Sequence, residues 1–293
     1  MLIVGSDCRT TGRAAHGIDA VIDDPPLVFC PMSSLQFGAH VGSDDPIAEA
    51  AARGADIVQI FLGEPQSWKK PQAQYPGGAE ALRSAAEGAG VGIYVHAPYI
   101  INVASTNNRI RIPSRKLLQQ TVTEAAAVGA RGVIVHGGHV TADDEPEKGY
   151  DNWLKAVDGL KLEVPILIEN TAGGNNAMAR HLHAIQGVWE AISTSTNIDS
   201  VGFCLDTCHA HAAGLDLKTV VDDIKGITGR IDLLHCNDSR DVAGSGADRH
   251  TGLGNGTIKV NDIAAIVGAA AAPVILETPS DGHVAEIEWL RSL

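Results

Sequence analysis

From about residue 32 onward, short apolar runs alternate with longer stretches in which apolar residues recur at helical spacing. The runs are rich in Ile, Val and Leu and lack strict alternation with polar residues, which is typical of strands buried on both faces of a parallel sheet. The eight runs are Phe37–Ala39, Ile57–Phe61, Val91–Val95, Gly132–Val135, Ile166–Ile168, Val201–Leu205, Ile231–Leu234 and Val274–Leu276. The stretches between them predict helices, among them Pro46–Gly54, Ala79–Gly88, Ser114–Gly129, Ala177–Ser193, Leu217–Gly226 and His283–Leu293.

Eight strand–helix repeats in about 260 residues match the size and rhythm of a (β/α)8 TIM barrel. An open, doubly wound α/β sheet is the alternative. Such a sheet is usually marked by a glycine-rich phosphate loop, and the sequence contains neither GxGxxG nor GxxxxGKS/T. We therefore predict a single barrel domain over residues 32–293.

Residues 1–31 differ from the rest of the chain because they show no sustained period of 2 or 3.6. They also lack the basic flank and the apolar run of a signal peptide. We expect an N-terminal extension here, or a natural start at Met32.

Six consecutive predicted strands, beginning with the third, are followed by a side chain that can bind a metal ion. These residues are His96, His136, Glu169, Asp206, His235 and Glu277. In a TIM barrel the C-terminal strand ends meet at one mouth, where barrel enzymes carry their chemistry. A single polar residue after a strand is ordinarily structural, because loops begin there. Six in succession predict a metal site, since carboxylates gathered at one mouth repel each other and a divalent cation offsets that repulsion.

Three further residues extend this set. His209 lies three positions after Asp206, so a first helical turn would place both on one face. Asp248 and His250 are two apart, so an extended loop would project both in the same direction. The nine residues comprise five His, two Glu and two Asp, a mixture that suits zinc and exceeds the need of one ion. Two or three ions about 3.5–4 Å apart are suited to phosphoryl displacement, and ligand type alone leaves manganese and iron open.

The charge balance is acidic, with 22 Lys+Arg against 35 Asp+Glu and a formal net charge of -13. Such a balance argues against a general nucleic-acid coat, because a polyanion is repelled at long range. Locally the picture differs, since the segment 97–116 carries four basic residues and no acid. We expect basic side chains to rim the mouth and meet phosphates there. They are Lys69, Lys70, Arg109, Arg111, Arg115, Lys116, Arg240 and Arg249.

The five cysteines are odd in number and contain no CxxC pair. In a chain of this size they indicate reduced thiols and a cytoplasmic protein. The spacing of Cys204 and Cys208 could hold zinc, although burial as small apolar residues is the more frequent role of free cysteine. No apolar stretch is long enough to predict a membrane span.

Several segments resemble, in the same order, the motifs of endonuclease IV, a family of metal-dependent apurinic/apyrimidinic endonucleases. The most specific are FCLDTCHAHAAGLD (203–216) and HCNDSRDVAGSGADRH (235–250). HAPYIIN (96–102), VHGGH (135–139), IENTAG (168–173) and ILETP (275–279) also match. GAHVGS (38–43) and IVQIFLGEPQSW (57–68) extend the resemblance to about residue 35.

The resemblance implies a trinuclear zinc enzyme, with manganese as a possible substitute, that hydrolyses DNA on the 5′ side of abasic sites. It would leave a 3′-hydroxyl and a 5′-deoxyribose phosphate, with Glu169 as the catalytic residue that orients the attacking hydroxide. The implied ligand groups are His96, His136 and Glu169; Glu169, Asp206, His235 and Glu277; and His209, Asp248 and His250.

The resemblance further implies that Tyr99 and Ile100 form a wedge that enters the base stack where the abasic nucleotide is flipped out. Gln66 and Trp68 would lie in a loop that probes the minor groove. The chain departs from the family pattern at Gln66, where some members carry a basic residue, and at VHGG, which replaces the common HPG turn. The implied partner is duplex DNA containing abasic sites. We expect a monomer without nucleotide cofactor or membrane partner.

Two other functions remain open. A metal-dependent sugar isomerase or epimerase of similar barrel fold would need one or two ions, which leaves His209, Asp248 and His250 without a role. A non-catalytic protein that binds DNA lesions is the second, and the complete ligand set argues against it.

Overall fold

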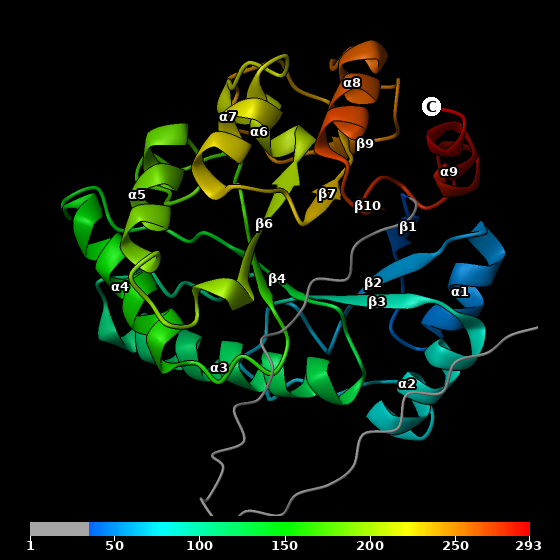
Figure 1. The fold of residues 1–293 in the computed structure, drawn as a ribbon, viewed down its shortest axis with the longest axis horizontal. Coiled ribbons are helices and arrows are strands. Elements are labelled where there is room, and N and C mark those ends of the chain that lie inside the picture. The colour runs from blue at the N-terminus through cyan, green and yellow to red at the C-terminus, as the bar shows by residue number, and fades with distance from the viewer. Residues whose placement is uncertain (1–34) are drawn as a thin grey trace, which may run out of the picture.

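Eight parallel strands close into a barrel in the computed structural model, which describes residues 35–293. The predicted (β/α)8 fold is therefore confirmed (Figure 1). The predicted extension 1–31 and the alternative start at Met32 lie outside the described residues. The strands are β1 Phe37–His40, β2 Ile57–Phe61, β3 Gly92–His96, β4 Val133–His136, β5 Ile166–Glu169, β6 Val201–Asp206, β7 Leu233–His235 and β10 Val274–Leu276.

Helices surround the barrel strands (Figure 1). They are α1 Pro46–Arg53, α2 Gly78–Ala89, α3 Asn108–Ala127, α4 Pro146–Gly159, α5 Leu182–Ile192, α6 Thr207–Ala213, α7 Val220–Thr228, α8 Val260–Ala270 and α9 His283–Arg291. A short antiparallel hairpin, β8 Asp238–Ser239 with β9 His250–Thr251, lies between β7 and α8. Among the described helices, none combines the length and apolar character needed to cross a membrane.

The predicted start of α3 at Ser114 is wrong. The helix begins at Asn108, where the Asn107 side chain accepts a hydrogen bond from the Arg109 amide. Pro113 is the sixth residue of the helix, so it has no amide hydrogen to donate to the Arg109 carbonyl. Arg109 and Arg111, which precede the predicted helix, therefore lie within the observed helix.

The start of α5 also differs from the prediction, which placed it at Ala177. Residues 177–179 instead pair with neighbouring backbone: the Met178 amide donates to Gly138 O at 2.8 Å and the Thr171 amide to Ala179 O at 3.0 Å. The segment is thus held against the loops that follow β4 and β5, and the helix begins only at Leu182.

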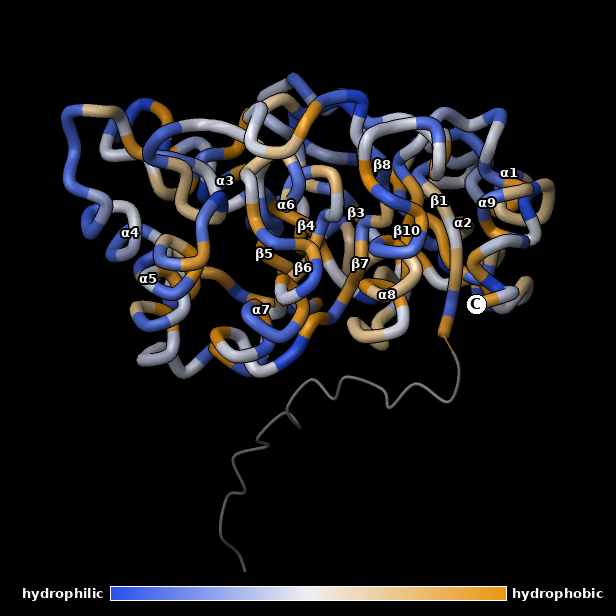
Figure 2. The backbone as a smooth tube through the Cα atoms, turned by 90° about the horizontal axis from the view of Figure 1, so that it is seen from above, coloured by the Kyte–Doolittle hydropathy of each residue, from blue (hydrophilic) through white to orange (hydrophobic). Residues whose placement is uncertain are grey.

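The barrel interior is filled by one apolar or weakly polar residue from each of seven strands. This layer consists of Ile57, Tyr94, Ile134, Leu167, Cys204, Leu233 and Ile275, all buried. Because side chains alternate between the two faces of a strand, the residue two positions further on also points inward, nearer the C-terminal mouth. A larger apolar cluster joins the outward-facing side chains of the strands to the helices around the barrel. Figure 2 shows the hydrophobic colour concentrated along the strands.

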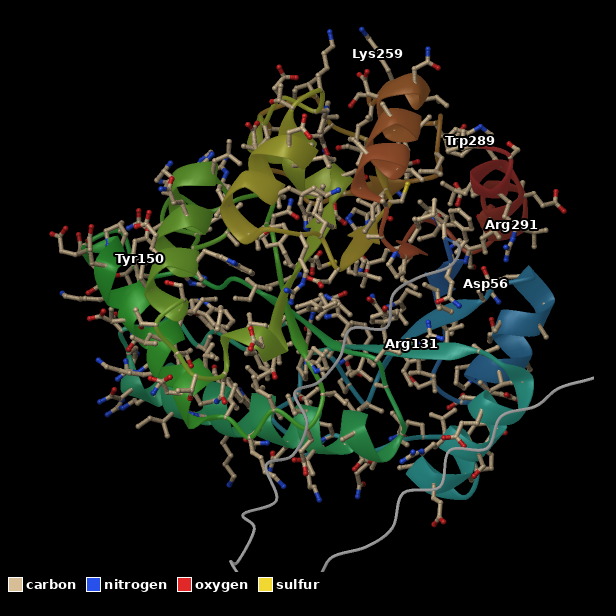
Figure 3. All side chains as sticks on the ribbon, in the orientation of Figure 1. Asp56, Arg131, Tyr150, Lys259, Trp289 and Arg291 are labelled. Atoms are coloured by element: carbon tan, nitrogen blue, oxygen red, sulfur yellow. The ribbon has the colours of Figure 1, made fainter. Side chains whose placement is uncertain are left out.

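An ion pair helps to hold the C-terminal helix against the start of the barrel. Arg291 Nη2 of α9 lies 2.8 Å from Asp56 Oδ2, and the two residues are labelled near one another in Figure 3. The same Asp56 oxygen accepts a hydrogen bond from the Phe37 amide at 3.0 Å. Asp56 thereby links α9 to β1 where the strand begins.

Candidate metal centre

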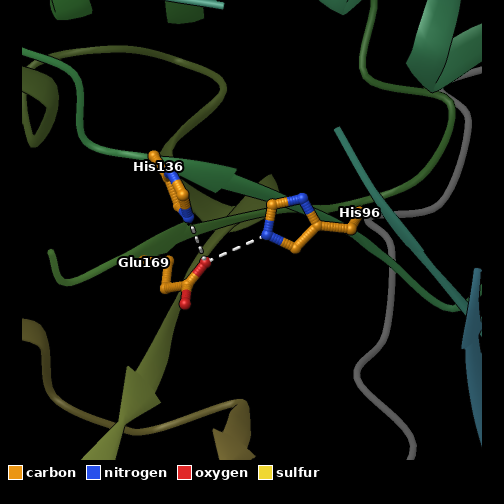
Figure 4. Close-up of side chains that lie close together, drawn as sticks. All are labelled: His96, His136 and Glu169. Atoms are coloured by element: carbon orange, nitrogen blue, oxygen red, sulfur yellow. Dashed lines mark hydrogen bonds and ion pairs between the residues drawn. The ribbon is translucent and has the colours of Figure 1, made fainter. Parts of the chain in front are cut away.

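The first ligand group lies at the ends of β3, β4 and β5 (Figure 4). Glu169 Oε2 is 3.2 Å from His96 Nε2 and 3.3 Å from His136 Nε2. The Glu169 side chain has no exposed surface. One carboxylate oxygen thus faces two imidazole nitrogens, an arrangement that can bind a single ion.

The second group shares Glu169 and uses its other oxygen. Glu169 Oε1 lies 3.1 Å from His235 Nδ1, and the same nitrogen is 3.4 Å from Glu277 Oε2. Asp206 completes the group, whose candidate ligand atoms all lie within 4.8 Å of one another. Three carboxylates around one imidazole favour a cation between them.

The third group lies beside the second and consists of His209, Asp248 and His250. Asp248 Oδ1 is 3.2 Å from His209 Nε2 and 3.1 Å from His250 Nε2. Neither Nε2 atom has a hydrogen-bond partner of acceptable geometry, although both are buried. Buried polar atoms are normally paired. Two unpaired nitrogens beside one carboxylate therefore fit a metal ion bound by all three side chains.

Neighbouring acceptors select which ring nitrogen of each histidine is available to a metal. His96 Nδ1 donates to Ala97 O at 2.7 Å, and His209 Nδ1 donates to Asn170 O at 2.9 Å. In both residues Nε2 keeps its lone pair, whereas His235 Nε2 lies 2.8 Å from Gln59 Oε1, which leaves Nδ1 free. In each ring the free nitrogen is the one that belongs to a ligand group, as expected when outer contacts orient metal ligands.

The electrostatics of the cluster favour added positive charge. Burial alone would raise the pKa of Glu169, but His235 and His136 hold it well below its ordinary value. Burial would likewise lower the pKa of His209, which Asp206 and Asp248 instead raise well above its ordinary value. Protons and divalent cations compete for such sites.

Three buried amides that the sequence reasoning missed support the ligands. Gln59 Nε2 donates to Glu277 Oε1 at 2.6 Å and also lies 3.0 Å from His40 Nδ1. Asn237 Nδ2 donates to Asp206 Oδ2 at 2.6 Å. Asn170 Oδ1 accepts from the Asp206 amide at 2.7 Å. Asn170 and Asn237 follow a ligand or lie two residues after one, which is a usable signal, whereas Gln59 is a lone polar residue inside an apolar run.

Asp238 anchors the loop that carries Asp248 and His250 of the third group. Its carboxylate accepts from the amides of Gly254 at 3.1 Å, Gly256 at 2.9 Å and Ile258 at 3.0 Å. A Cβ atom at Gly256 would lie 2.3 Å from Ser239 O, so this close approach requires glycine. The loop after β7 is therefore fixed at its base, although Asp248 near its middle is 54% exposed.

Known proteins are similar to this chain in fold and sequence. A family model described as xylose isomerase-like TIM barrel matches residues 47–293. The probable endonuclease 4 of Mycobacterium tuberculosis (strain ATCC 25177 / H37Ra) is 56% identical over 257 residues, covering 88% of this chain and 98% of that protein. The chain belongs to the endonuclease 4 family.

Solved structures agree with this membership. Endonuclease IV from Thermus thermophilus has 28% sequence identity and a TM-score of 0.75, covering 88% of this chain and 98% of that chain. A D-tagatose 3-epimerase-like protein has 18% identity and a TM-score of 0.71, covering 88% and 96%. The second likeness concerns the fold alone.

In this endonuclease 4 family member, three of the residues expected to contact DNA line a cavity of about 440 Å³ beside the first ligand group: Trp68, Tyr99 and Ile100. The Tyr99 ring stacks on the His136 ring with centroids 5.6 Å apart. The Tyr99 amide also donates to Pro65 O at 2.9 Å, which joins the loops after β2 and β3. Gln66 is exposed in the first of these loops and does not line the cavity.

The basic residues expected at the mouth fall into two sets: some bind other groups of the protein, and the others are exposed to solvent. Arg249 pairs with Asp241, Arg111 donates to the carbonyls of Ser105 and Thr106, and Arg115 donates to Asn152 O at 2.7 Å. Arg240, Lys69, Lys70, Arg109 and Lys116 are exposed.

The two cysteines spaced by four residues do not form one site in the described part of the chain. Both are buried free thiols. Cys204 belongs to the interior apolar layer, whereas Cys208 lies within ligand distance of Asp206 and His250. Cys204 also borders the metal centre, because its thiol interacts with the His235 side chain, but no candidate ligand group among the described residues contains both cysteines.

Proposed function

We propose that this chain is an apurinic/apyrimidinic endonuclease that hydrolyses the phosphodiester on the 5′ side of an abasic site in duplex DNA. The products would be a 3′-hydroxyl and a 5′-deoxyribose phosphate. The observation that carries the proposal is the set of three adjacent ligand groups, two of which share Glu169, in a chain of the endonuclease 4 family. Because all nine side chains come from one chain, we further propose that the enzyme acts as a monomer.

We propose three zinc ions, one for each ligand group, with manganese as a possible substitute. The donor sets of imidazole and carboxylate suit zinc, and the unpaired Nε2 atoms of His209 and His250 fit a bound ion. When bound, such ions supply Lewis acidity toward the phosphate and a hydroxide at neutral pH.

Glu169 is the catalytic residue of this proposal. Its ionised, fully buried carboxylate accepts a hydrogen bond from the attacking water and orients the oxygen toward phosphorus. A bond forms between that oxygen and phosphorus, the P–O3′ bond breaks, and the proton that the attacking water loses neutralises the departing 3′ oxygen. The exposed Tyr99 and its neighbour Ile100 are placed to fill the gap left in the base stack, since both line the cavity beside His136.

The test is cleavage of a duplex with one synthetic abasic site by wild type and Glu169→Gln. We expect the variant to lose at least ~10³-fold in kcat, within the range for removing a positioned acid–base group. Glu163→Gln is the matched control, since Glu163 is exposed before β5, at the opposite end of the barrel. Equal cleavage by wild type and Glu169→Gln would rule out this mechanism.

Metal content and substrate tests separate the alternatives. About three ions per chain with cleavage of abasic DNA support the proposal. One or two ions together with turnover of a ketose would favour a sugar isomerase or epimerase, a reaction class for which the fold likeness to an epimerase-like protein gives precedent. An abasic duplex bound tightly and left intact would favour a non-catalytic lesion-binding protein.

A further inference from the structure

A second groove runs alongside α3, next to the cavity at the metal centre. Its volume is about 660 Å³, and it is lined from the loop after β2 and from one side of α3. Trp68 and Ile110 line both this groove and the cavity that reaches His136. A DNA strand leaving the metal centre past Tyr99 would therefore reach the groove across Trp68 and Ile110.

The side of α3 that faces the groove follows helical spacing. Arg109, Pro113, Lys116, Leu117 and Gln120 line it, at intervals of four, seven, eight and eleven residues, which places them on one face of a helix. Arg111 and Arg115 occupy other positions of the helix and donate to backbone carbonyls. The helix thus carries two sets of basic residues: one binds backbone carbonyls of the protein, and the other faces the groove.

The groove combines positive charge with apolar surface. Lys70, Arg109 and Lys116 supply three cations, and no acidic residue lines the groove. Within the described residues, none of these three cations takes part in a salt bridge. Trp68, half exposed, and Ile110 add apolar surface, so this face offers more than phosphate contacts.

This combination discriminates between duplex and unpaired DNA. A duplex presents mainly phosphates to a protein surface outside its grooves, and cations alone satisfy those contacts. An unpaired strand also exposes base faces, which stack on aromatic side chains while cations track the backbone. Only an unpaired strand therefore offers base faces that can contact the apolar side chains of the groove.

We propose that this groove binds an unpaired segment of the substrate DNA next to the incised site, with a base against Trp68 and phosphates at Lys70, Arg109 and Lys116. The inference rests on the proposed function for the identity of the substrate. It adds a preference for lesions close to a single-stranded tail or gap.

The test measures binding by fluorescence anisotropy with four labelled DNAs: a ten-residue oligothymidine, a blunt abasic duplex, and two forms of the same duplex that carry a thymidine tail at one end or at the other. The variant is Lys70→Gln/Lys116→Gln. The matched control is Lys155→Gln/Lys161→Gln, which removes the same charge at exposed positions on α4 and just beyond it.

For the groove variant we expect at least ~10-fold weaker binding of oligothymidine and of one tailed duplex, and a smaller loss for the blunt duplex, whose phosphates these lysines can also meet at the mouth. The slope of log affinity against log salt for oligothymidine should fall by about 1.4, since each lost phosphate contact contributes about 0.7. The control should match wild type on all four DNAs.

Unchanged binding of oligothymidine and of both tailed duplexes would overturn the proposal. So would an equal loss on blunt and tailed duplexes, because the groove would then follow the duplex backbone. Cleavage of the blunt abasic duplex is measured in parallel. If wild type fails to cut it, the proposed function fails, while the oligothymidine measurement still decides the groove.

Discussion

The ligands at the strand ends and the ligands on the loop after β7 are held in different ways. Glu169 ends β5, has no exposed side-chain surface and faces imidazoles on both carboxylate oxygens. Asp248 lies between β8 and β9 and is 54% exposed. The first is placed by the register of the barrel, and the second depends on the conformation of a loop.

The difference shows what each kind of ligand needs from the rest of the chain. A strand-end ligand is positioned by backbone pairing, as where His136 lies opposite Glu169 and Asp206 opposite His235 in the β-ladders. The loop ligands require an anchor, which Asp238 supplies through the amides of the same loop. We therefore expect the third ligand group to be the more easily perturbed.

The largest effect is expected at Glu169, because two groups share it. Glu169→Ala should remove the ion of the first group, which keeps only two ligands, and weaken binding of the ion in the second group, which keeps three, while the third group still binds its ion. Metal analysis of the purified protein by mass spectrometry measures this. Retention of three ions would show that Glu169 is not a shared ligand.

A smaller loss is expected at the loop group. Asp248→Ala should lower zinc content to about two ions, because His209 and His250 alone leave the site short of ligands. Activity on abasic DNA should fall by about 10²-fold or more. Asp158→Ala is the control, since Asp158 is exposed near the end of α4. Loss of all three ions would mean that the groups are not independent.

A smaller effect is expected at Asp238, which anchors the loop that carries Asp248 and His250. Asp238→Asn exchanges one acceptor oxygen for an amide group that cannot accept from the loop amides, so the loop should loosen. We expect zinc affinity of the third group to fall ~10–100-fold, the range for outer partners of metal ligands. Competition with a coloured chelator measures the affinity for each zinc ion. The ions of the first and second groups should bind as tightly as in wild type.

The smallest effect is expected at Gln59, beneath the strand-end ligands. Gln59→Leu keeps a similar volume but removes the contacts to His235 and Glu277. Zinc affinity of the second group should fall by about 10-fold, while the third group keeps its affinity. A larger loss at the third group than at the second would reverse the proposed assignment of Gln59.

The apolar runs determined the strands, and with them much of the candidate site. Strand boundaries follow from local periodicity, and a strand's inward residues recur at every second position. The strand-end ligands lie two positions beyond the interior layer, as Glu169 does after Leu167 and Asp206 after Cys204. The order of such residues along the chain was therefore enough to predict that they meet at one mouth.

Contacts between distant segments were decided only by the tertiary structure. Gln59 lies within an apolar run, and its partners His235 and Glu277 are 176 and 218 residues away. Arg109 and Arg111 are two residues apart in one basic segment, yet one lines the groove and the other binds backbone carbonyls. Periodicity reports which way a side chain points from its own element, whereas the partner it meets depends on how the barrel brings other elements beside it.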